Sequence, residues 1–461
     1  MTDKFFPMSG FPFLCPYGKS RPHEQGGIMR YGLVFLMTLS LWGLEVSAAA
    51  VSVKNDNSAY VFLQADKLAQ VKQQLRNQSA PPQMQLAYQQ LLRAADSDMK
   101  KTDLSVTQKL SMPPGGNRHD YLSLAAYWWP DPQRKDGLPW VRHDGKVNPA
   151  TKGEETDAIR LATFTDRVQV LALAWYFSDR PEYAAKAASM IRTWFITPDT
   201  RMNPNLNYAQ AIPGRNDGRG AGVLDGRFFA TRIVDALVIL RQAPGWSVSD
   251  EQQMRQWMTD YLQWLLSSHN GKQEAAAKNN HGSWYTVQVA GIAAYLGQPE
   301  TVKAMAALQR QKLDHQLAAD GSQPEELART RSFHYSGFNL QAVSMMAAVA
   351  GKYGDNLWLY RTPNGSSLLS ALDFMTPYLD ESRPWPYKTM GREGSPLIPL
   401  MMQAEQAIGS PRYQAAIRQA GFAPLLTGAS EGKKDAEVSV DTRRRIWLLS
   451  PPSSTGNTPT P

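Results

Sequence analysis

Apolar residues recur every three to four positions along most of this sequence, and that spacing constrains the fold more than any other feature. Residues 159–178, for example, place Phe164, Val168 and Leu171 on one stripe, as a helix packed against a core does. The pattern breaks just before Pro181 and restarts there, and proline suits the first turn of a helix. Because strongly alternating runs are scarce and no strand–helix–strand order occurs, the sequence predicts an all-α fold.

The same periodicity predicts a long series of antiparallel helix pairs. The predicted helices cover residues 59–77, 82–100, 159–178, 181–195, 226–242, 249–268, 283–296, 299–318, 338–353, 366–379, 397–408 and 411–420. Short connections make successive helices antiparallel, and the pairs show no tight repeat of the tetratricopeptide or ankyrin kind. Such a series is typical of an α/α toroid or an α-solenoid.

Two long irregular segments, residues 111–153 and 197–225, interrupt the predicted helices. Loops of this length in a compact domain are usually functional or else disordered. Their content of tryptophan, tyrosine, histidine and arginine argues against disorder. We therefore expect both segments to contribute to a binding site.

The N-terminal sequence predicts export from the cytoplasm. Residues 29–48 combine one arginine, an apolar run and several small residues, which is the layout of a secretory signal peptide. An uncleaved signal anchor is the alternative interpretation. We expect translation to start at Met29, cleavage to follow Ala48, and the mature protein to be periplasmic or secreted, without stable membrane association. The chain thus divides into an over-extended N-terminus of residues 1–28, a signal peptide of 29–48, a single helical domain of 49–445 and a flexible tail of 446–461.

Composition narrows the chemistry that is available to the mature chain. The sole cysteine, Cys15, precedes the signal peptide, so no thiol would remain for disulfides, thiolate catalysis or metal binding. Seven histidines are scattered without an HExxH motif or a close pair, and we expect no metal and no cofactor. A net charge of +8, with 13 tryptophans and 18 tyrosines, favours a polyanion that stacks on aromatic rings. Export and a dispersed basic charge disfavour nucleic acid, which leaves an acidic polysaccharide.

Two segments that precede apolar helices carry the reactive side chains. The first, KNNHGSWY at residues 278–285, places Asn279, Asn280 and His281 at a helix entrance, where free backbone N–H groups attract anions. Its simplest interpretation is an N-cap beside one surface histidine. The second, PEELARTRSFHYSGFNL at residues 324–340, collects glutamates, arginines, a histidine and a tyrosine. Taken alone, it is typical of a charged, solvated face.

Together, these side chains supply the parts for β-elimination at a 4-linked uronate. That reaction needs a neutralised C6 carboxylate, a base that removes the C5 proton and an acid that protonates the departing O4. Asparagine and arginine can bind the carboxylate, histidine or a deprotonated tyrosine can act as the base, and a tyrosine hydroxyl can act as the acid. Mannuronate and glucuronate lose H5 and O4 from one face, so one tyrosine could serve both steps. Guluronate and galacturonate favour two separate groups.

The motif NNHGSW, followed 54 residues after His281 by Tyr335 within RTRSFHYSGFNL, resembles the alginate lyase superfamily of polysaccharide lyases. The upstream segments HDYLSLAAYWWPDP and GLPWVRHDGKVNP resemble that superfamily's aromatic-rich signature, so the resemblance covers residues 113–385. It implies an incomplete (α/α) toroid, built from antiparallel helix pairs around a long cleft. It also implies that Asn280 binds the substrate carboxylate, that His281 is the base or a neutralising group, and that Tyr335 is the acid, or both acid and base.

The resemblance implies one further catalytic residue, an arginine just before the tyrosine. Arg329 and Arg331 both fit this description, and we expect Arg329 to be the catalytic arginine, with Arg331 as the alternative. His334 is adjacent to Tyr335 and is expected to point elsewhere on the helix.

Substrate binding is expected to involve the irregular segments. The run Tyr127-Trp128-Trp129 offers flat rings for sugar stacking, and Arg219 and Arg227 could line an anionic cleft. The predicted substrate-binding residues are His119, Tyr121, Tyr127, Trp128, Trp129, Arg215, Asn279 and Arg331.

The sequence therefore predicts a polysaccharide lyase that cleaves a 4-linked polyuronate, either alginate (mannuronan) or glucuronan, by β-elimination to give 4,5-unsaturated uronate ends. Two alternatives stay open. A non-catalytic periplasmic protein would bind an acidic glycan without cleaving it. An α/α-toroid glycoside hydrolase would use two carboxylates from the set Glu154, Glu155, Asp157, Asp225, Glu325 and Glu326.

Overall fold

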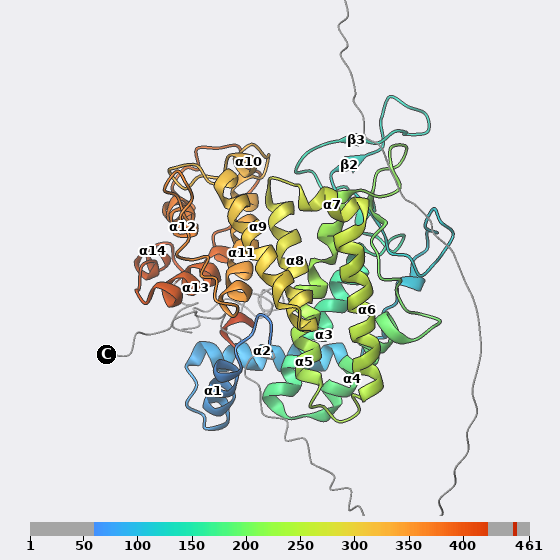
Figure 1. Ribbon diagram of the computed structural model, residues 1–461, viewed down its shortest axis with the longest axis horizontal. Coiled ribbons are helices and arrows are strands. Elements are labelled where there is room, and N and C mark those ends of the chain that lie inside the picture. The colour runs from blue at the N-terminus through green and yellow to red at the C-terminus, as the bar shows by residue number, and fades with distance from the viewer. Residues whose placement is uncertain (1–59, 423–445, 450–461) are drawn as a thin grey trace, which may run out of the picture. The chain divides into compact units, whose positions relative to one another are not determined.

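The computed structural model describes residues 60–422 and 446–449 (Figure 1). The predicted over-extended N-terminus at 1–28, the signal peptide at 29–48 and most of the predicted tail at 446–461 lie outside the described residues. Within the described part, no helix is both long and apolar enough to cross a lipid bilayer.

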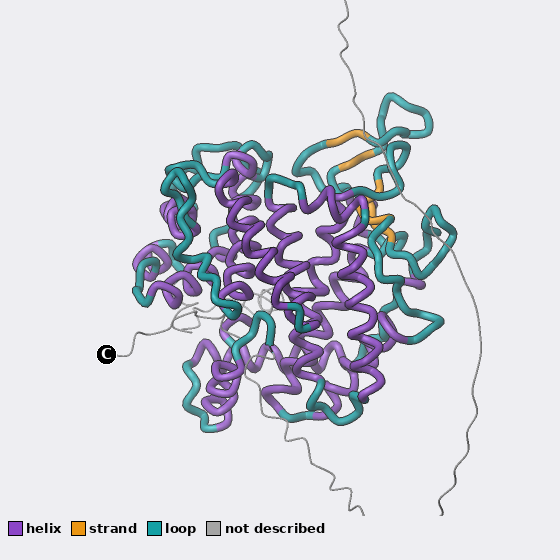
Figure 2. Tube along the Cα trace, in the orientation of Figure 1, coloured by secondary structure: helices purple, strands orange, loops and turns teal. Residues whose placement is uncertain are grey.

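Helices make up most of the described chain, which confirms the all-α prediction (Figure 2). The elements are α1 (Ala65–Arg76), α2 (Pro82–Met99), β1 (Leu122–Leu124), β2 (Trp128–Trp129), β3 (Val141–Arg142), α3 (Ala158–Ser178), α4 (Pro181–Ile191), β4 (Tyr208–Ala211), α5 (Val234–Leu240), α6 (Val248–Ser267), α7 (His269–Ala275), α8 (Asn280–Leu296), α9 (Pro299–Gln316), α10 (Pro324–Leu327), α11 (Ser332–Gly351), α12 (Leu368–Met375), α13 (Ile398–Ile408) and α14 (Gln414–Gln419). The predicted ranges omit α7 and α10, because one is polar and the other spans a single turn.

The central element of the helical assembly is α8. It packs against α6, α9 and α11, and nearly all of its side chains are buried (Figure 1). A helix that is apolar on every side belongs in a core. It turns into α9 at Gly297, whose positive φ of 76° ends the helix in the left-handed conformation. The pair α3 and α4 forms a second helical hairpin of the same kind.

The starts of α8 and α11 lie at the same end of the helical assembly. The helix α7 leads into α8, and α10 leads into α11, at the top of Figure 1 beside β2 and β3. The start of α11 at Ser332, rather than at residue 338 as predicted, brings Tyr335 into the helix. Both reactive sequence segments are therefore presented at one end of the molecule.

The two irregular segments, residues 111–153 and 197–225, contain two small sheets, one of which joins the segments to each other. The strand β1 pairs in parallel with β4, and β2 pairs antiparallel with β3. Asp157, just before α3, accepts the backbone N–H of Leu122 at 3.1 Å and pairs with the buried amine of Lys109 at 3.1 Å. These contacts anchor β1 to the helical core.

The end of the described chain differs from the predicted flexible tail of 446–461. Ile446–Leu448 form a short 3-10 helix that contacts α2, and Leu449 is fully buried. Removal of apolar side chains from water stabilises this contact. The helical domain therefore includes residues 446–449.

Candidate active site

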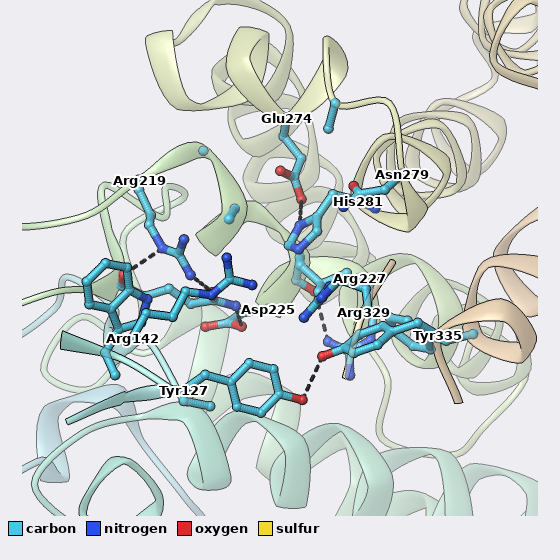
Figure 3. A pocket seen from close by; sticks show the side chains of 18 of the residues that line it. Tyr127, Arg142, Arg219, Asp225, Arg227, Glu274, Asn279, His281, Arg329 and Tyr335 are labelled. Carbon is cyan, nitrogen blue, oxygen red and sulfur yellow. Dashed lines mark hydrogen bonds and ion pairs between the residues drawn. The ribbon is translucent and has the colours of Figure 1, made fainter. Parts of the chain in front are cut away.

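A cavity of about 800 Å³ lies where the starts of α8 and α11 meet the irregular segments (Figure 3). Most of its charged side chains are cationic. Its wall includes Arg142, Lys152, Arg219, Arg227 and Arg329, against the carboxylates of Asp225 and Glu274. A cleft lined mainly by one sign of charge focuses the electrostatic field and attracts the opposite charge. The cavity is therefore suited to an anionic ligand.

His281 lies in the first turn of α8, with one ring nitrogen anchored. Its backbone N–H donates to the side-chain oxygen of Asn279, the N-cap residue, at 3.2 Å. Its Nδ1 lies 2.7 Å from Oε1 of Glu274, which belongs to α7 (Figure 3). A carboxylate can only accept, so Nδ1 carries a hydrogen, and the neutral ring keeps Nε2 as an acceptor. Because His281 lines the cavity, Nε2 suits a general base there.

The position after His281, Gly282, has no room for a side chain. A Cβ atom at this position would collide with the carbonyl oxygen of Ala277 and the amine of Lys312. That amine donates to the carbonyl oxygens of Ala275 and Ala277 at 2.6 and 2.9 Å. It thereby fixes the turn that holds the carboxylate of α7 beside the histidine of α8.

Tyr335 lies in the first turn of α11 and lines the cavity. Its hydroxyl donates to the hydroxyl of Tyr127 at 2.6 Å, and the guanidinium of Arg329 lies 3.9 Å from its ring centroid (Figure 3). Burial raises the pKa of Tyr335 above its ordinary value, Tyr127 raises it further, and Arg329 opposes the shift. Tyr335 therefore keeps its proton at neutral pH, as a general acid must.

Asp144, in the loop after β3, fixes the position of Arg329. Its carboxylate accepts hydrogen bonds from Nη2 and Nε of Arg329 at 2.8 and 3.3 Å, and from the hydroxyl and backbone N–H of Thr330 at 2.8 and 3.2 Å. Burial disfavours the charged form, but these hydrogen bonds hold the pKa of Asp144 well below its ordinary value. Charge-assisted bonds of this type are the stronger class of hydrogen bond.

Asn280 is turned away from the cavity wall. Its side chain is fully buried, and its Nδ2 donates to both carboxylate oxygens of Glu326 at 2.9 and 3.1 Å. Its backbone N–H donates to the same carboxylate at 2.6 Å. The asparagine that lines the cavity is Asn279. This placement differs from the predicted contact between Asn280 and the substrate carboxylate, because the first helical residue of α8 faces α10 instead.

Of the predicted aromatic run, Tyr127 and Trp128 line the cavity. Trp129 points to the other side of β2, where its indole N–H donates to the carbonyl oxygen of Lys146 at 3.1 Å. Consecutive residues of a strand face opposite sides, which explains the division. Arg215 is also outside the cavity lining, and its guanidinium lies 5.1 Å from the ring centroid of Trp128.

Three further predicted binding residues lie outside the cavity lining. Tyr121 is fully buried, and its hydroxyl donates to Asp225 at 3.0 Å, so it supports a cavity carboxylate from behind. His119 has Nδ1 2.6 Å from the carbonyl oxygen of Arg201. Arg331 lines a neighbouring cavity rather than this one.

Several other residues line the cavity, although they were not among the predicted site residues. Arg219 and Arg227 line it, and burial lowers the pKa of Arg227 to about 10, so its guanidinium stays charged at neutral pH. His334 lines it as well, in contrast to the expectation that it points elsewhere. Arg142 and Glu274 were not predicted. Arg142 lies within GLPWVRHDGKVNP, which already carried part of the resemblance, whereas Glu274 lies on the unpredicted helix α7.

The carboxylates named for the hydrolase alternative do not come together. Asp225 lines the cavity, Glu326 lies behind it, and Asp157 is buried near β1. The exposed members of that set are Glu154, Glu155 and Glu325. In the part of the chain that the structure describes, no group of three histidine, cysteine, aspartate or glutamate side chains could hold a metal ion. The absence of a metal and of a cofactor stays a prediction.

Comparison with known proteins assigns the family. Residues 105–385 match the family model for alginate lyase. This chain belongs to the alginate lyase family. An alginate lyase from Bacteroides ovatus shares 32% sequence identity with it at a TM-score of 0.75, over 85% of this chain and 99% of that chain. Alginate lyase A1-III from Sphingomonas species A1, as a histidine-to-alanine variant complexed with a tetrasaccharide, shares 16% identity at a TM-score of 0.52, over 83% and 98%. No curated protein sequence matches the chain.

Membership of the alginate lyase family makes the chain a polysaccharide lyase. It confirms the incomplete (α/α) toroid and decides against both the glycoside hydrolase and the non-catalytic glycan-binding protein. The family match includes the segments that carry His281, Arg329 and Tyr335, together with both irregular segments.

Proposed function

We propose that the cavity binds a 4-linked polyuronate of the alginate type and cleaves it by β-elimination, leaving a 4,5-unsaturated uronate end. The observation that carries the proposal is the convergence of His281, Arg329 and Tyr335 on one cationic cavity. The relatives support the choice of substrate, because one is named an alginate lyase and another was solved with a tetrasaccharide.

Arg329 is the proposed binding partner of the reacting uronate's carboxylate. Its guanidinium lines the cavity, and Asp144 holds it there through Nη2 and Nε. Asn279 lines the same cavity and offers an amide N–H₂ group. Neutralisation of the carboxylate stabilises the negative charge that develops when C5 loses its proton, and this effect is largest in a site from which water is displaced.

His281 is the proposed base and Tyr335 the proposed acid. The raised pKa of Tyr335 disfavours the tyrosinate form that a tyrosine base would need, whereas Nε2 of His281 is an acceptor when the ring is neutral. Nε2 of His281 takes the C5 proton, and the electron pair of the C5–H bond forms the C4–C5 double bond. The C4–O4 bond breaks, and the Tyr335 hydroxyl protonates O4. Transfer of the proton from His281 back to Tyr335, through solvent, restores both groups.

Cellular location is part of the same proposal. A signal peptide at residues 29–48 would export the enzyme to the periplasm or the medium, with the lyase domain starting at residue 49. The mass of the protein recovered from the periplasm or medium tests this, because the proposal predicts a mature chain that begins at Ala49. A recovered chain that keeps residues 29–48 would contradict it.

The activity is tested with a panel of polyuronates: mannuronate-rich and guluronate-rich alginate, glucuronan and polygalacturonate. We expect ultraviolet absorbance from the unsaturated uronate end with at least one alginate or glucuronan substrate. New reducing ends without that absorbance would mean hydrolysis and would overturn the proposed reaction.

A further inference from the structure

A second cavity, of about 570 Å³, adjoins the catalytic cavity. The two cavities share His334 and Phe338, which lie one helical turn apart on α11 and stack with ring centroids 5.9 Å apart and an angle of 10° between their planes. We call this pair the aromatic ridge. The rest of the second cavity is lined by Arg331, Phe333, Gly337, Gln341 and residues of the segment 391–397. A ligand long enough to leave the catalytic cavity can therefore cross the ridge and enter the second one.

Two arginines give the second cavity an excess of positive charge. The guanidinium of Arg392 donates to the carbonyl oxygens of Arg383 and Asp380 at 2.6 and 3.1 Å, which orients it without neutralising it. Arg331 lines the same cavity. Glu393 is the acidic residue of this lining. The chemistry favours a ligand that carries carboxylates spaced along a chain.

We propose that the second cavity is an outer subsite for the same polyuronate, an inference that rests on the proposed function. One sugar ring stacks its C–H face on the aromatic ridge, and the next uronate places its carboxylate against Arg392 and Arg331. The segment 391–397 follows the end of the family match at residue 385, so part of this subsite lies outside the matched region. The outer subsite selects for chain length, because short oligomers that fill the catalytic cavity do not reach it.

Two substitutions in the lining of the second cavity test the outer subsite. Arg392→Gln removes a charge, and Gln341→Trp fills the cavity from an exposed position on α11. For each variant, KM is measured with size-fractionated oligomers of mannuronate, guluronate and glucuronate. We expect KM for long oligomers to rise roughly tenfold, as loss of one charge-assisted contact implies, and KM for the shortest cleaved oligomer to rise far less. Arg361→Gln, an exposed arginine that lines neither cavity, is the matched control.

The outcomes separate the outer subsite from the proposed function. The outer subsite is rejected if both variants change KM equally for long and short oligomers, or if neither variant changes KM for either. In both cases the lyase reaction stands. If the wild-type enzyme forms no unsaturated product from any polyuronate, the proposed function is rejected and the outer subsite with it. Circular dichroism shows whether the Arg392→Gln variant is folded. If it is misfolded, the KM values of Gln341→Trp decide whether the outer subsite exists.

Discussion

The two walls of the catalytic cavity are built in different ways. The helical wall, which we define as His281, Arg329 and Tyr335, stands at the starts of α8 and α11. Buried hydrogen bonds behind it tie α8 to both α9 and α10. The loop wall, which we define as residues 127–147, comes from the irregular segment around β2 and β3. Its Tyr127 contacts Tyr335 of the helical wall (Figure 3), and its Asp144 accepts hydrogen bonds from Arg329.

This difference suggests that the two walls have different roles in the reaction. The helical wall holds the groups that we propose to move protons, on elements whose positions are set by the core. The loop wall contacts those groups from 185 to 208 positions away in the sequence, through side chains. We infer that the helical wall determines the chemical steps and that the loop wall positions the groups that perform them. Substitutions in the two walls should therefore reduce activity by different amounts.

Tyr335→Phe gives the largest expected effect, because it removes the proposed acid from the helical wall. General acid–base groups contribute roughly a hundredfold to ten-thousandfold, so we expect kcat to fall about a thousandfold. The rate of formation of unsaturated product measures it. Tyr353→Phe, just beyond the end of α11 and outside the cavity lining, is the control and should retain full activity. A Tyr335→Phe variant with a normal rate would remove Tyr335 from the mechanism.

Glu326, buried behind the helical wall, should make the stability of the protein depend on pH. Burial raises the pKa of Glu326 to about 7 from 4.5, although hydrogen bonds from Asn280 oppose the shift. Between pH 4.5 and about 7, Glu326 keeps its proton in the folded protein but has lost it in the unfolded chain. The contribution of Glu326 is therefore fully present below pH 4.5 and is lost as the pH rises to about 7, a change of roughly 3 kcal/mol in the free energy of unfolding.

Glu326→Gln should abolish that loss, since glutamine does not titrate. Urea denaturation across the same pH range measures the free energy of unfolding for both proteins. The wild-type protein should lose stability relative to the variant as the pH rises. Glu325→Gln, at the exposed neighbouring position, is the matched control and should follow the wild-type curve. If Glu326→Gln also follows that curve, the buried carboxylate does not titrate in this range.

The helical wall was the more predictable of the two from sequence. Apolar periodicity located α8 and α11, and the motif resemblance selected His281 and Tyr335, which both line the cavity. The resemblance assigned the contact with the substrate carboxylate to Asn280, whereas Asn279 is the asparagine that lines the cavity. Which of the two lines the cavity depends on the N-cap, because Asn279 caps α8 while Asn280 starts the helix and turns toward Glu326. A capping asparagine and a first-turn asparagine look alike in sequence.

The loop wall was much less predictable, for a physical reason. Its residues are placed by two-residue strands and by contacts with distant segments, and neither leaves a periodic pattern. Trp128 and Trp129 were grouped as one stacking surface, but β2 turns them to opposite sides. Asp144 was passed over, although it lies within GLPWVRHDGKVNP, because its role depends on a partner 185 positions away.

Asp144→Asn should have the next largest effect, because it removes the charge that holds Arg329. Hydrogen bonds to charged groups contribute about 1.5–3 kcal/mol, so we expect kcat/KM to fall on the order of thirtyfold. The asparagine keeps the shape of the side chain, which leaves the fold intact. Asp136→Asn, at an exposed position of the same segment, controls for surface charge. A rise in kcat/KM would instead show that Asp144 competes with the substrate carboxylate for Arg329.

Tyr127→Phe should have the smallest effect and gives the sharpest test of the division between the walls. It removes a neutral hydrogen bond of 2.6 Å to Tyr335, worth about 0.5–1.5 kcal/mol, so we expect kcat/KM to fall by a few fold. In the double variant with Asp144→Asn, the two losses should not add, because both contacts hold the same loop wall against the helical wall. Full additivity in this double-mutant cycle would mean that each contact acts separately. A loss at Tyr127 as large as that of Tyr335→Phe would place Tyr127 among the groups that transfer protons, and the division between the walls would fail.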